Sequence, residues 1–478
     1  MGFGAKPQEE KPLHIQFLSI YDITLPIRKW GRVMRKMALR ELARHVGVEV
    51  ETDELIEGYR IDSRLVEIGD LFFALKGERA DGHEYLCDAR AKGAVAAVVD
   101  KSYEGSGFGL ELIRVDDVKR ALQEMARFSL RFKPVFVVGI TGSVGKTTTK
   151  EFVATLLEGK YSVGKTPGSY NSQATLPLTV LNRGDEKVLV LEMGMSQPGE
   201  IERLVEIAPP DVALVTKIAL SHSAFFPGGI EEIRQEKMNI FSHPKTKVKI
   251  VPDPLCLACL GKDAVYFSQE DRDADYFLWA SDEIGYVDEK AVRAFQFDLP
   301  FKEAHMLNNV LAAIAICRQM SMQWDEIHHQ IPKLKKPAMR FEEREEAGVR
   351  LINDAYNANP ESMKAALSSL PQPKDGGKRI AVLASMKELG AFSEESHRDV
   401  GLFAQKFVDH LLTLGSEAEL LAQTFSEAQK PSEHFSDLQE VAKRLGELMR
   451  PGDVVLLKGS RSMRLEELLE HIHPQGGR

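Results

Sequence analysis

One stretch, residues 135–149 (Val-Phe-Val-Val-Gly-Ile-Thr-Gly-Ser-Val-Gly-Lys-Thr-Thr-Thr), constrains the fold of this chain more than any other. Its first part, 135–140, is a short apolar run rich in β-branched residues, as in a buried strand of a parallel sheet. A glycine-rich segment comes next, and apolar residues then recur at helical spacing at positions 152, 153, 156 and 157. The stretch therefore predicts a strand, a glycine-rich turn and a helix, in that order.

The predicted turn is suited to holding phosphate. Gly142 and Gly145 would let backbone N–H groups approach phosphate oxygens, and the helix N-terminus would face the same anion. Lys146 can reach the β- and γ-phosphates, and Thr147 can offer its hydroxyl to Mg²⁺. Because Ile140 stands where the strict G-x-x-x-x-G-K-[ST] pattern has its first glycine, we predict a variant P-loop. The alternative is a glycine turn followed by a surface lysine.

Length and composition set the remaining limits. A chain of 478 residues is too long for one core and predicts roughly two to four domains. A formal charge of -9 argues against a nucleic-acid partner, and no apolar run is long enough for a membrane span. The four cysteines are scattered, which favours a reducing, cytoplasmic location. Cys256 and Cys259 form one C-x-x-C, which we interpret as small buried residues rather than a metal site.

Shifts in pattern divide the chain into an extension and three domains. Residues 1–36 are basic but lack the apolar region of a secretory signal, and we predict a disordered extension. Residues 37–133 alternate apolar runs and polar turns, as in a small α/β domain. Residues 134–336 form the P-loop domain, and 337–478 form a third unit. In the first domain Arg64, Lys76 and His83 could meet a phosphate or a base, although ordinary surface charge is an equal alternative.

Within the central region, polar residues follow apolar runs. Glu192 ends the run 188–191, and His222 follows the run 212–215. Open parallel sheets place ligand groups just beyond the carboxyl ends of their strands, so both side chains fall where metal ions of a bound nucleotide would lie. For His222 a structural role is an equal alternative. His305 and Asn309 share one face of a predicted helix over 303–320, where such a polar pair is more often solvated surface.

The last third reads as a doubly wound, Rossmann-like α/β unit. Strands are predicted at 349–352, 380–383, 411–414 and 454–457, separated by helical segments. Polar segments again follow the strands, beginning with Asp354 after the first and Lys458 after the last. No G-x-G-x-x-G follows any of these strands, which argues against a dinucleotide site.

From about Met37 onward the chain resembles the Mur ligases, the ATP-dependent amide-forming enzymes of peptidoglycan synthesis. The resemblance rests on the P-loop, on residues 354–363 (Asp-Ala-Tyr-Asn-Ala-Asn-Pro-Glu-Ser-Met), on Met-Lys-Glu-Leu-Gly at 386–390 with His397, and on Lys-Gly-Ser at 458–460. The string at 354–363 resembles the member that adds D-alanyl-D-alanine to UDP-N-acetylmuramoyl-tripeptide. These two small molecules are then the implied substrates, with ATP and two Mg²⁺ ions as cofactors. The resemblance also implies a monomer.

The resemblance assigns roles by position. For the nucleotide it implies Gly142, Ser143, Gly145, Lys146, Thr147, Thr148, Asn309, Arg340 and Asp354. For Mg²⁺ it implies Thr147, Glu192, His222 and Lys237, the last as a carbamylated lysine; on sequence alone, a surface lysine beside Glu236 is favoured for that position. The catalytic set is Lys146, Glu192, His222 and Lys237. For the substrate it implies Ser63, Arg64, Asp81 and His83 at the uridine diphosphate end, together with Asn171, Tyr356, Asn357 and Lys458.

The implied reaction proceeds through an acyl phosphate, formed when the substrate carboxylate attacks ATP. Two alternatives stay open. One is a sister amide ligase, either another Mur enzyme or a protein like folylpolyglutamate synthetase. The other is a P-loop regulatory NTPase, which the absence of an Asn-Lys-x-Asp motif disfavours. The sequence does not decide whether the third residue of the tripeptide is diaminopimelate or lysine.

Overall fold

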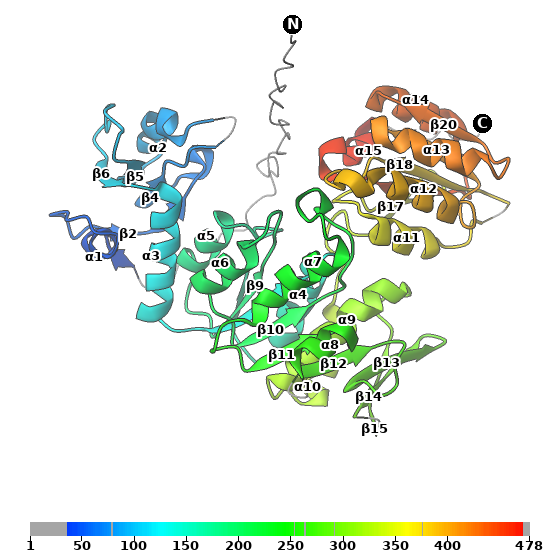
Figure 1. Cartoon of the computed structure of the whole chain (residues 1–478), viewed down its shortest axis with the longest axis horizontal. Helices are drawn as coiled ribbons and strands as arrows, with labels where there is room; N and C mark the ends of the chain where they lie inside the picture. Colours follow the sequence, from blue (N-terminus) through cyan, green and yellow to red (C-terminus); the bar gives the residue numbers. More distant parts are fainter. Residues whose placement is uncertain are drawn as a thin grey trace, which may run out of the picture.

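The computed structural model describes residues 36–471, apart from residues 78, 79, 253, 262, 263, 291 and 375. The predicted extension over 1–36 therefore lies outside the described residues, except for Lys36. Three lobes follow one another along the chain, each built on its own main sheet (Figure 1). The predicted class, α/β with three domains, is confirmed.

The N-terminal lobe contains a parallel sheet in the order β3-β4-β5-β6. Phe72 of β4 packs in one apolar cluster while its neighbours Leu71 and Phe73 pack in another, so the sheet is covered on both faces. The elements are β1 (Met37–Ala38), α1 (Leu39–His45), β2 (Leu55–Ile56), β3 (Gly58–Arg60), η1 (Ser63–Leu65), β4 (Asp70–Phe73), η2 (Gly82–Tyr85), α2 (Leu86–Ala91), β5 (Ala96–Asp100), β6 (Glu111–Val115) and α3 (Val118–Phe132).

The central lobe is organised on a nine-stranded sheet in the order β15-β14-β13-β12-β11-β10-β7-β9-β8. The strands from β8 to β13 pair in parallel, whereas β13, β14 and β15 pair antiparallel. The strands are β7 (Phe136–Thr141), β8 (Val163–Lys165), β9 (Val188–Glu192), β10 (Val212–Val215), β11 (Val248–Val251), β12 (Ala264–Ser268), β13 (Tyr276–Ser281), β14 (Ile284–Glu289) and β15 (Val292–Asp298). The helices are α4 (Lys146–Leu157), α5 (Thr175–Leu181), α6 (Glu200–Ile207), η3 (Ser223–Phe225), α7 (Ile230–Met238), η4 (Asn239–Phe241), α8 (Pro254–Leu260), α9 (Ala304–Gln319), α10 (Trp324–Gln330) and η5 (Ile331–Lys333).

The C-terminal lobe has a six-stranded sheet in the order β16-β17-β21-β18-β19-β20, antiparallel only between β16 and β17. Its strands are β16 (Glu342–Glu346), β17 (Val349–Asn353), β18 (Arg379–Ala384), β19 (His410–Leu414), β20 (Ser432–Phe435) and β21 (Val454–Lys458). Its helices are α11 (Pro360–Ser368), η6 (Gly390–Phe392), α12 (Ser393–Ala404), η7 (Ser416–Ala418), α13 (Glu419–Ser426), α14 (Leu438–Leu448), η8 (Arg461–Met463), η9 (Leu465–Glu467) and α15 (Leu468–His471).

The N-terminal and central lobes are joined through buried groups. Asn182, just after α5, accepts a hydrogen bond from the backbone N–H of Tyr59 at 3.0 Å and donates one to its carbonyl at 3.0 Å. The limits predicted for the domains, at residues 133 and 336, stay predictions. Over the described ranges, no helix combines the length and the apolarity that crossing a membrane requires.

Candidate functional site

The predicted P-loop forms between β7 and α4. Gly142 and Gly145 have φ of +146° and +90°, which disfavour any residue with a side chain. A Cβ at Gly142 would lie 1.8 Å from Thr216 Oγ1, so the backbone passes too close to β10 for a larger residue. Lys146 donates from Nζ to the carbonyl of Gly142 at 2.9 Å, and burial lowers the pKa of its ammonium while the nearby Glu192 opposes that shift.

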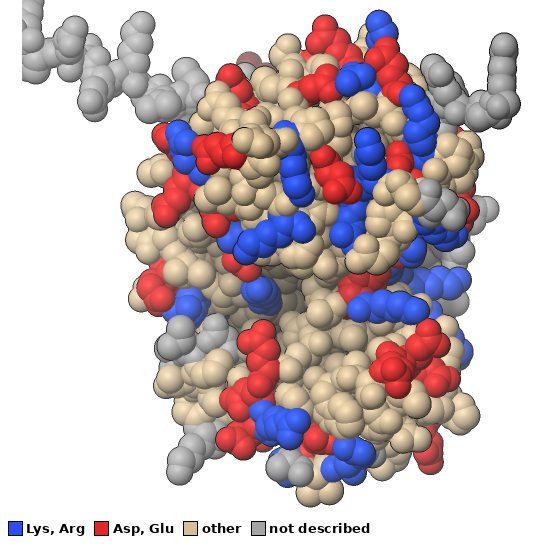
Figure 2. All heavy atoms as spheres, turned by 90° about the vertical axis from the view of Figure 1, so that its right-hand side faces the viewer, with Lys and Arg blue, Asp and Glu red and all other residues tan. Residues whose placement is uncertain are grey.

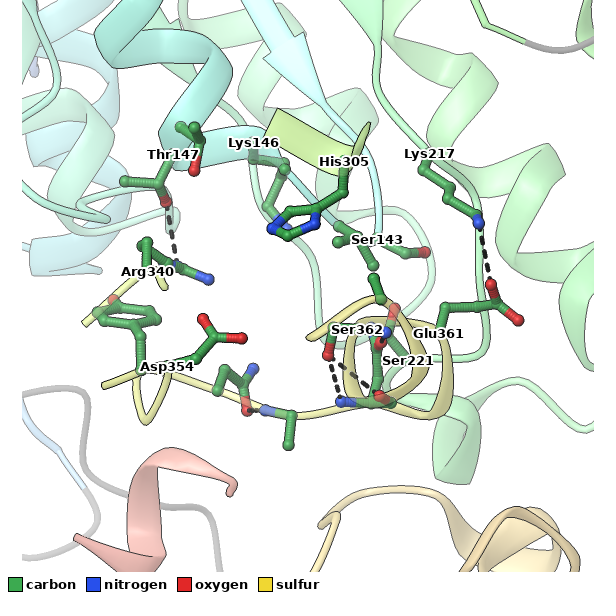
Figure 3. Close-up of a pocket in the computed structure, with 18 of the residues that line it drawn as sticks. Ser143, Lys146, Thr147, Lys217, Ser221, His305, Arg340, Asp354, Glu361 and Ser362 are labelled. Atoms are coloured by element: carbon green, nitrogen blue, oxygen red, sulfur yellow. Dashed lines mark hydrogen bonds and ion pairs between the residues drawn. The ribbon is translucent and has the colours of Figure 1, made fainter. Parts of the chain in front are cut away.

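Thr147, the second residue of α4, lies between two lobes. Its hydroxyl is 3.0 Å from the hydroxyl of Ser169 and accepts a hydrogen bond from Arg340 at 3.3 Å (Figure 3). The guanidinium of Arg340 also stacks on Tyr356, 3.9 Å from the ring centre. Arg340, the residue of the C-terminal lobe that was predicted to contact the nucleotide, therefore already contacts the segment that follows the P-loop glycines.

Glu192 ends β9 and is almost fully buried, with 1% of its surface exposed. Asn171 donates to Oε1 at 2.7 Å, but Oε2 is buried with no hydrogen-bond partner. A buried carboxylate oxygen without a donor is costly unless a cation meets it. Carboxylate and hydroxyl oxygens are also the ligands that Mg²⁺ prefers, so Glu192 and Thr147 fit a Mg²⁺ ion.

His222 lies in the turn that follows β10, directly before η3. Its Nδ1 hydrogen-bonds to the carboxylate of Glu388, from the C-terminal lobe, and Nε2 has no partner among the described residues. A neutral imidazole nitrogen is a common metal ligand, so Nε2 of His222 fits a bound divalent cation. The described residues contain no cluster of three or more His, Cys, Asp and Glu side chains that would form a metal site by themselves.

Lys237, on α7, is 1% exposed, which excludes the surface lysine that the sequence alone favoured. Its neighbour Glu236 instead accepts from the backbone N–H groups of Gly199 and Ile201, at the start of α6. Burial, and then the charge of Lys146, lower the pKa of Lys237 well below its ordinary value. Its ammonium makes no hydrogen bond or ion pair with any described residue.

On α9, His305 and Asn309 face the protein rather than open solvent. Asn309 is buried and accepts from the hydroxyl of Thr149 at 3.2 Å, so it supports the P-loop helix from behind. His305 is 3.2 Å from the hydroxyl of Ser369 in the C-terminal lobe, and burial lowers the pKa of its imidazole. Two polar residues at this helical spacing are more often solvated, and His305 and Asn309 differ from that case because both contact other parts of the protein.

In the C-terminal lobe the predicted residues hold one another. Lys458 Nζ donates to Asp354 Oδ2 at 2.6 Å and to the carbonyl of Asn357 at 3.2 Å. Asp354 Oδ1 accepts from the backbone N–H of Phe341 at 3.1 Å. Burial lowers the pKa of Lys458, and the carboxylate of Asp354 opposes that shift. The Lys458–Asp354 pair fixes the segment that contains Tyr356, the residue on whose ring Arg340 stacks.

These groups surround one cleft of about 2160 Å³ between the central and C-terminal lobes, visible as a hollow in Figure 2. The predicted residues that line it are Ser143, Gly145, Lys146, Thr147, Thr148, Asn171, Glu192, His222, Asn309, Arg340, Asp354, Tyr356, Asn357 and Lys458. Basic residues (Lys or Arg) and acidic residues both border the hollow, so the face has no single charge sign. Gly142 and Lys237 are not among the residues that line the cleft.

The predicted uridine diphosphate residues lie elsewhere, in the N-terminal lobe. Ser63 is buried, and Arg64 pairs with Asp62 at 2.8 Å. His83 contacts Asp81 through Nδ1 and accepts from the backbone N–H of Asp100 through Nε2 at 3.0 Å. Both ring nitrogens of His83 are therefore engaged within the lobe.

The sequence missed three residues that shape the site. Lys150, fully buried on α4, donates to the carbonyls of Thr166 and Gly168 and pairs with Glu151. It thereby anchors the loop that brings Ser169 to Thr147. Ser169 and Glu388 are the others. Glu388 lies in the string 386–390, to which the sequence assigned no role in the site, and the contacts of both residues in space reveal that role.

Three family descriptions match consecutive parts of the chain: "Mur ligase family, catalytic domain" over 55–129, "Mur ligase middle domain" over 140–317 and "Mur ligase, glutamate ligase domain" over 339–461. The UDP-N-acetylmuramoyl-tripeptide–D-alanyl-D-alanine ligase of Bacillus subtilis is 33% identical over 429 residues, covering 87% of this chain and 93% of that protein.

Two solved structures resemble the whole described fold. The MurF ligase of Thermotoga maritima, crystallised with ADP, superposes with a TM-score of 0.74 at 33% identity, covering 87% of this chain and 96% of the other. MurF of Acinetobacter baumannii superposes with a TM-score of 0.80 at 25% identity, covering 92% and 99%. The predicted resemblance is confirmed, and the chain belongs to the Mur ligase family.

Proposed function

We propose that this protein is the ATP-dependent, ADP-forming ligase that adds D-alanyl-D-alanine to UDP-N-acetylmuramoyl-tripeptide. The observation that carries the proposal is the shared cleft. It is lined by a P-loop lysine, by a carboxylate with one buried oxygen that has no donor, and by an arginine of the C-terminal lobe that reaches Thr147. Relatives whose sequences match this chain over nearly their whole length are named for that reaction. A monomeric, cytoplasmic enzyme is part of the proposal.

The reaction has two steps. The substrate carboxylate attacks the γ-phosphate of ATP, which gives an acyl phosphate and ADP; the amine of the dipeptide then displaces inorganic phosphate and forms the amide. Two like charges meet in the first step, so the ammonium of Lys146 and the backbone N–H groups of the P-loop must stabilise the charge that develops on the phosphoryl group. Thr147, Glu192 and His222 would hold Mg²⁺, which supplies further positive charge there when bound.

The C-terminal lobe would protect the acyl phosphate from water. Arg340 already reaches Thr147, and Lys217, beside the P-loop, pairs with Glu361 of α11 at 2.9 Å (Figure 3). Contacts of this kind bring the two walls of the cleft together and exclude solvent, as in other enzymes with reactive intermediates. The N-terminal lobe would hold the uridine diphosphate part through Ser63, Arg64, Asp81 and His83, and Asn171, Tyr356, Asn357 and Lys458 would contact the rest of the substrate.

Lys237 is proposed to be carbamylated. A neutral amine adds carbon dioxide and releases one proton, and the lowered pKa of the buried Lys237 favours that neutral form. The product is an anionic oxygen donor of the kind Mg²⁺ binds, next to the positive charge of Lys146. Lys237→Ala should lose activity that acetate partly restores, whereas full activity of this variant without acetate would contradict the carbamate.

The main test is an assay of ADP release with UDP-N-acetylmuramoyl-tripeptide, with and without D-alanyl-D-alanine. ADP release that depends on the dipeptide is expected. Release that ignores any amine acceptor would favour the regulatory NTPase. Release with meso-diaminopimelate, L-lysine or glutamate in place of the dipeptide would favour a sister ligase. Tripeptides ending in diaminopimelate and in lysine, compared in the same assay, determine the third residue.

A further inference from the structure

Two turns from different lobes meet at the edge of the cleft. One carries His222 and η3 of the central lobe, and the other carries Glu388 and leads into η6 of the C-terminal lobe. The backbone N–H of Ala224 donates to the carbonyl of Glu388 at 3.0 Å, and the hydroxyl of Ser223 donates to the carbonyl of Leu389 at 3.0 Å. These bonds fix the two backbones relative to one another independently of the side chains of His222 and Glu388.

At the centre of this contact the Glu388 carboxylate meets Nδ1 of His222. Both residues have left-handed backbones, with φ of +57° for His222 and +63° for Glu388, which is uncommon for residues with side chains. The two side chains are only partly exposed, at 24% and 33%. The neighbouring Lys387 does not neutralise Glu388, because it pairs with Glu417 at 2.6 Å.

The chemistry of the pair determines which nitrogen of the imidazole is left over. An ionised carboxylate only accepts hydrogen bonds, so Nδ1 of His222 must carry the proton that it donates. In the neutral ring the lone pair then lies on Nε2, the nitrogen that has no partner among the described residues.

We propose that Glu388 is a positioning residue: from the C-terminal lobe it fixes the orientation and the tautomer of His222, so that His222 binds a divalent cation well only while the two lobes are in contact. Carboxylates that hold a metal-binding histidine through its other nitrogen are a recurrent device in metalloproteins. The inference rests on the proposed role of His222 as a metal ligand, and it links metal affinity to closure of the cleft.

The test measures the ADP dissociation constant of the full chain with and without Mn²⁺. The ratio of the two constants reports metal binding, whereas damage to the nucleotide site alone would change both constants together. Glu388→Met removes the acceptor at nearly constant length and should reduce the ratio about tenfold or more. Glu388→Gln keeps an acceptor for Nδ1–H and should restore most of it. Glu394→Ala breaks an exposed ion pair with Arg398 within the C-terminal lobe and should leave the ratio unchanged.

His222→Ala separates the two levels of the argument. If it leaves the ratio unchanged, the metal role of His222 is wrong, and the inference about Glu388 falls with it. If His222→Ala reduces the ratio but Glu388→Met does not, only the inference is wrong. The same holds if Glu388→Met reduces the ratio further in a chain that already carries His222→Ala, because Glu388 then does not act through His222. Circular dichroism of each variant verifies folding, and Glu388→Ala replaces Glu388→Met if the latter does not fold.

Discussion

Replacing Gly145 with alanine should damage the P-loop through two separable effects. Gly145 precedes α4 at φ +90°, a left-handed conformation that costs a residue with a Cβ about 1–2 kcal/mol. The new Cβ would also lie 2.4 Å from Oδ1 of Asn309. Asn309 is buried and bonded to Thr149, so it has little room to turn away. Overpacking of this kind adds about 1–3 kcal/mol, for a total of roughly 2–5 kcal/mol.

Gly199 offers a matched control. It precedes α6 and is also left-handed, at φ +78°, but a Cβ there would meet no atom within 4 Å. Gly199→Ala should therefore cost only the conformational part, about 1–2 kcal/mol. Combining Gly145→Ala with Asn309→Ala removes the clash at the expense of the hydrogen bond to Thr149, worth about 0.5–1.5 kcal/mol.

Differential scanning calorimetry and ADP titration of the full chain measure these effects. We expect a lower melting temperature for Gly145→Ala than for Gly199→Ala, a partial recovery in the combined variant, and weaker ADP binding only where Gly145→Ala is present. Equal melting temperatures for the two glycine variants would show that the contact with Asn309 carries no energy. Unchanged ADP affinity in Gly145→Ala would refute the P-loop assignment itself.

Three further predictions concern charged side chains. Lys146→Ala should lower turnover by about a hundredfold or more in the ADP-release assay, because it removes positive charge from the phosphoryl group; near-normal turnover in a folded variant would contradict this. Lys150→Met should lower kcat/KM for ATP about tenfold, because it releases the loop that carries Ser169. The control Lys165→Met removes the other partner of Glu151 and should change kcat/KM little. Equal losses in the two variants would contradict an anchoring role of Lys150. The pKa of Glu417 is lowered from 4.5 to about 2: burial acts in the opposite direction, but the hydrogen bond from Lys387 outweighs it. This carboxylate therefore stabilises the fold above pH 4.5, and that contribution is lost as the pH falls through about 2. Melting temperatures of wild type and Glu417→Gln should converge over that range, and a constant difference would exclude the effect.

The parts of the fold that the sequence predicted well are those that local pattern determines. The run 188–191 is apolar at every position because β9 is buried on both faces, and such a run identifies a strand of a parallel sheet. Glycine and lysine spacing at 142–147 likewise depends only on neighbours in the chain. Strands β13 to β15 were not predicted, because side-chain polarity does not follow burial there: in β14 the apolar Ile284 is exposed while Gly285 beside it is buried.

Contacts between residues far apart in the sequence could not be predicted in the same way. His222 and Glu388 are separated by 166 positions and lie in irregular turns. In such turns neither hydrophobic periodicity nor secondary-structure propensity indicates where a side chain points. The pairing of Asp81 with His83 is different, since an aspartate two residues before a histidine is a local turn pattern. That pattern indicates a structural role, whereas the basic residues of this domain and the resemblance to the family suggested a ligand.

The burial of three lysines differs most from what their residue type predicts, and this burial affects the protonation of their amines. Lys150, Lys237 and Lys458 are 0%, 1% and 2% exposed, although lysine is among the residues least often buried. Lys150 is compensated by Glu151 and two carbonyls, and Lys458 by Asp354. Lys237 alone of the three has no hydrogen bond or ion pair among the described residues, and only the charge of the nearby Glu236 opposes the lowering of its pKa. A buried ammonium with so little compensation is costly. If only stability mattered, an apolar residue would be expected at this position instead of Lys237. The presence of a lysine therefore favours a chemical role for its amine in the neutral form, which is the form that carbamylation requires.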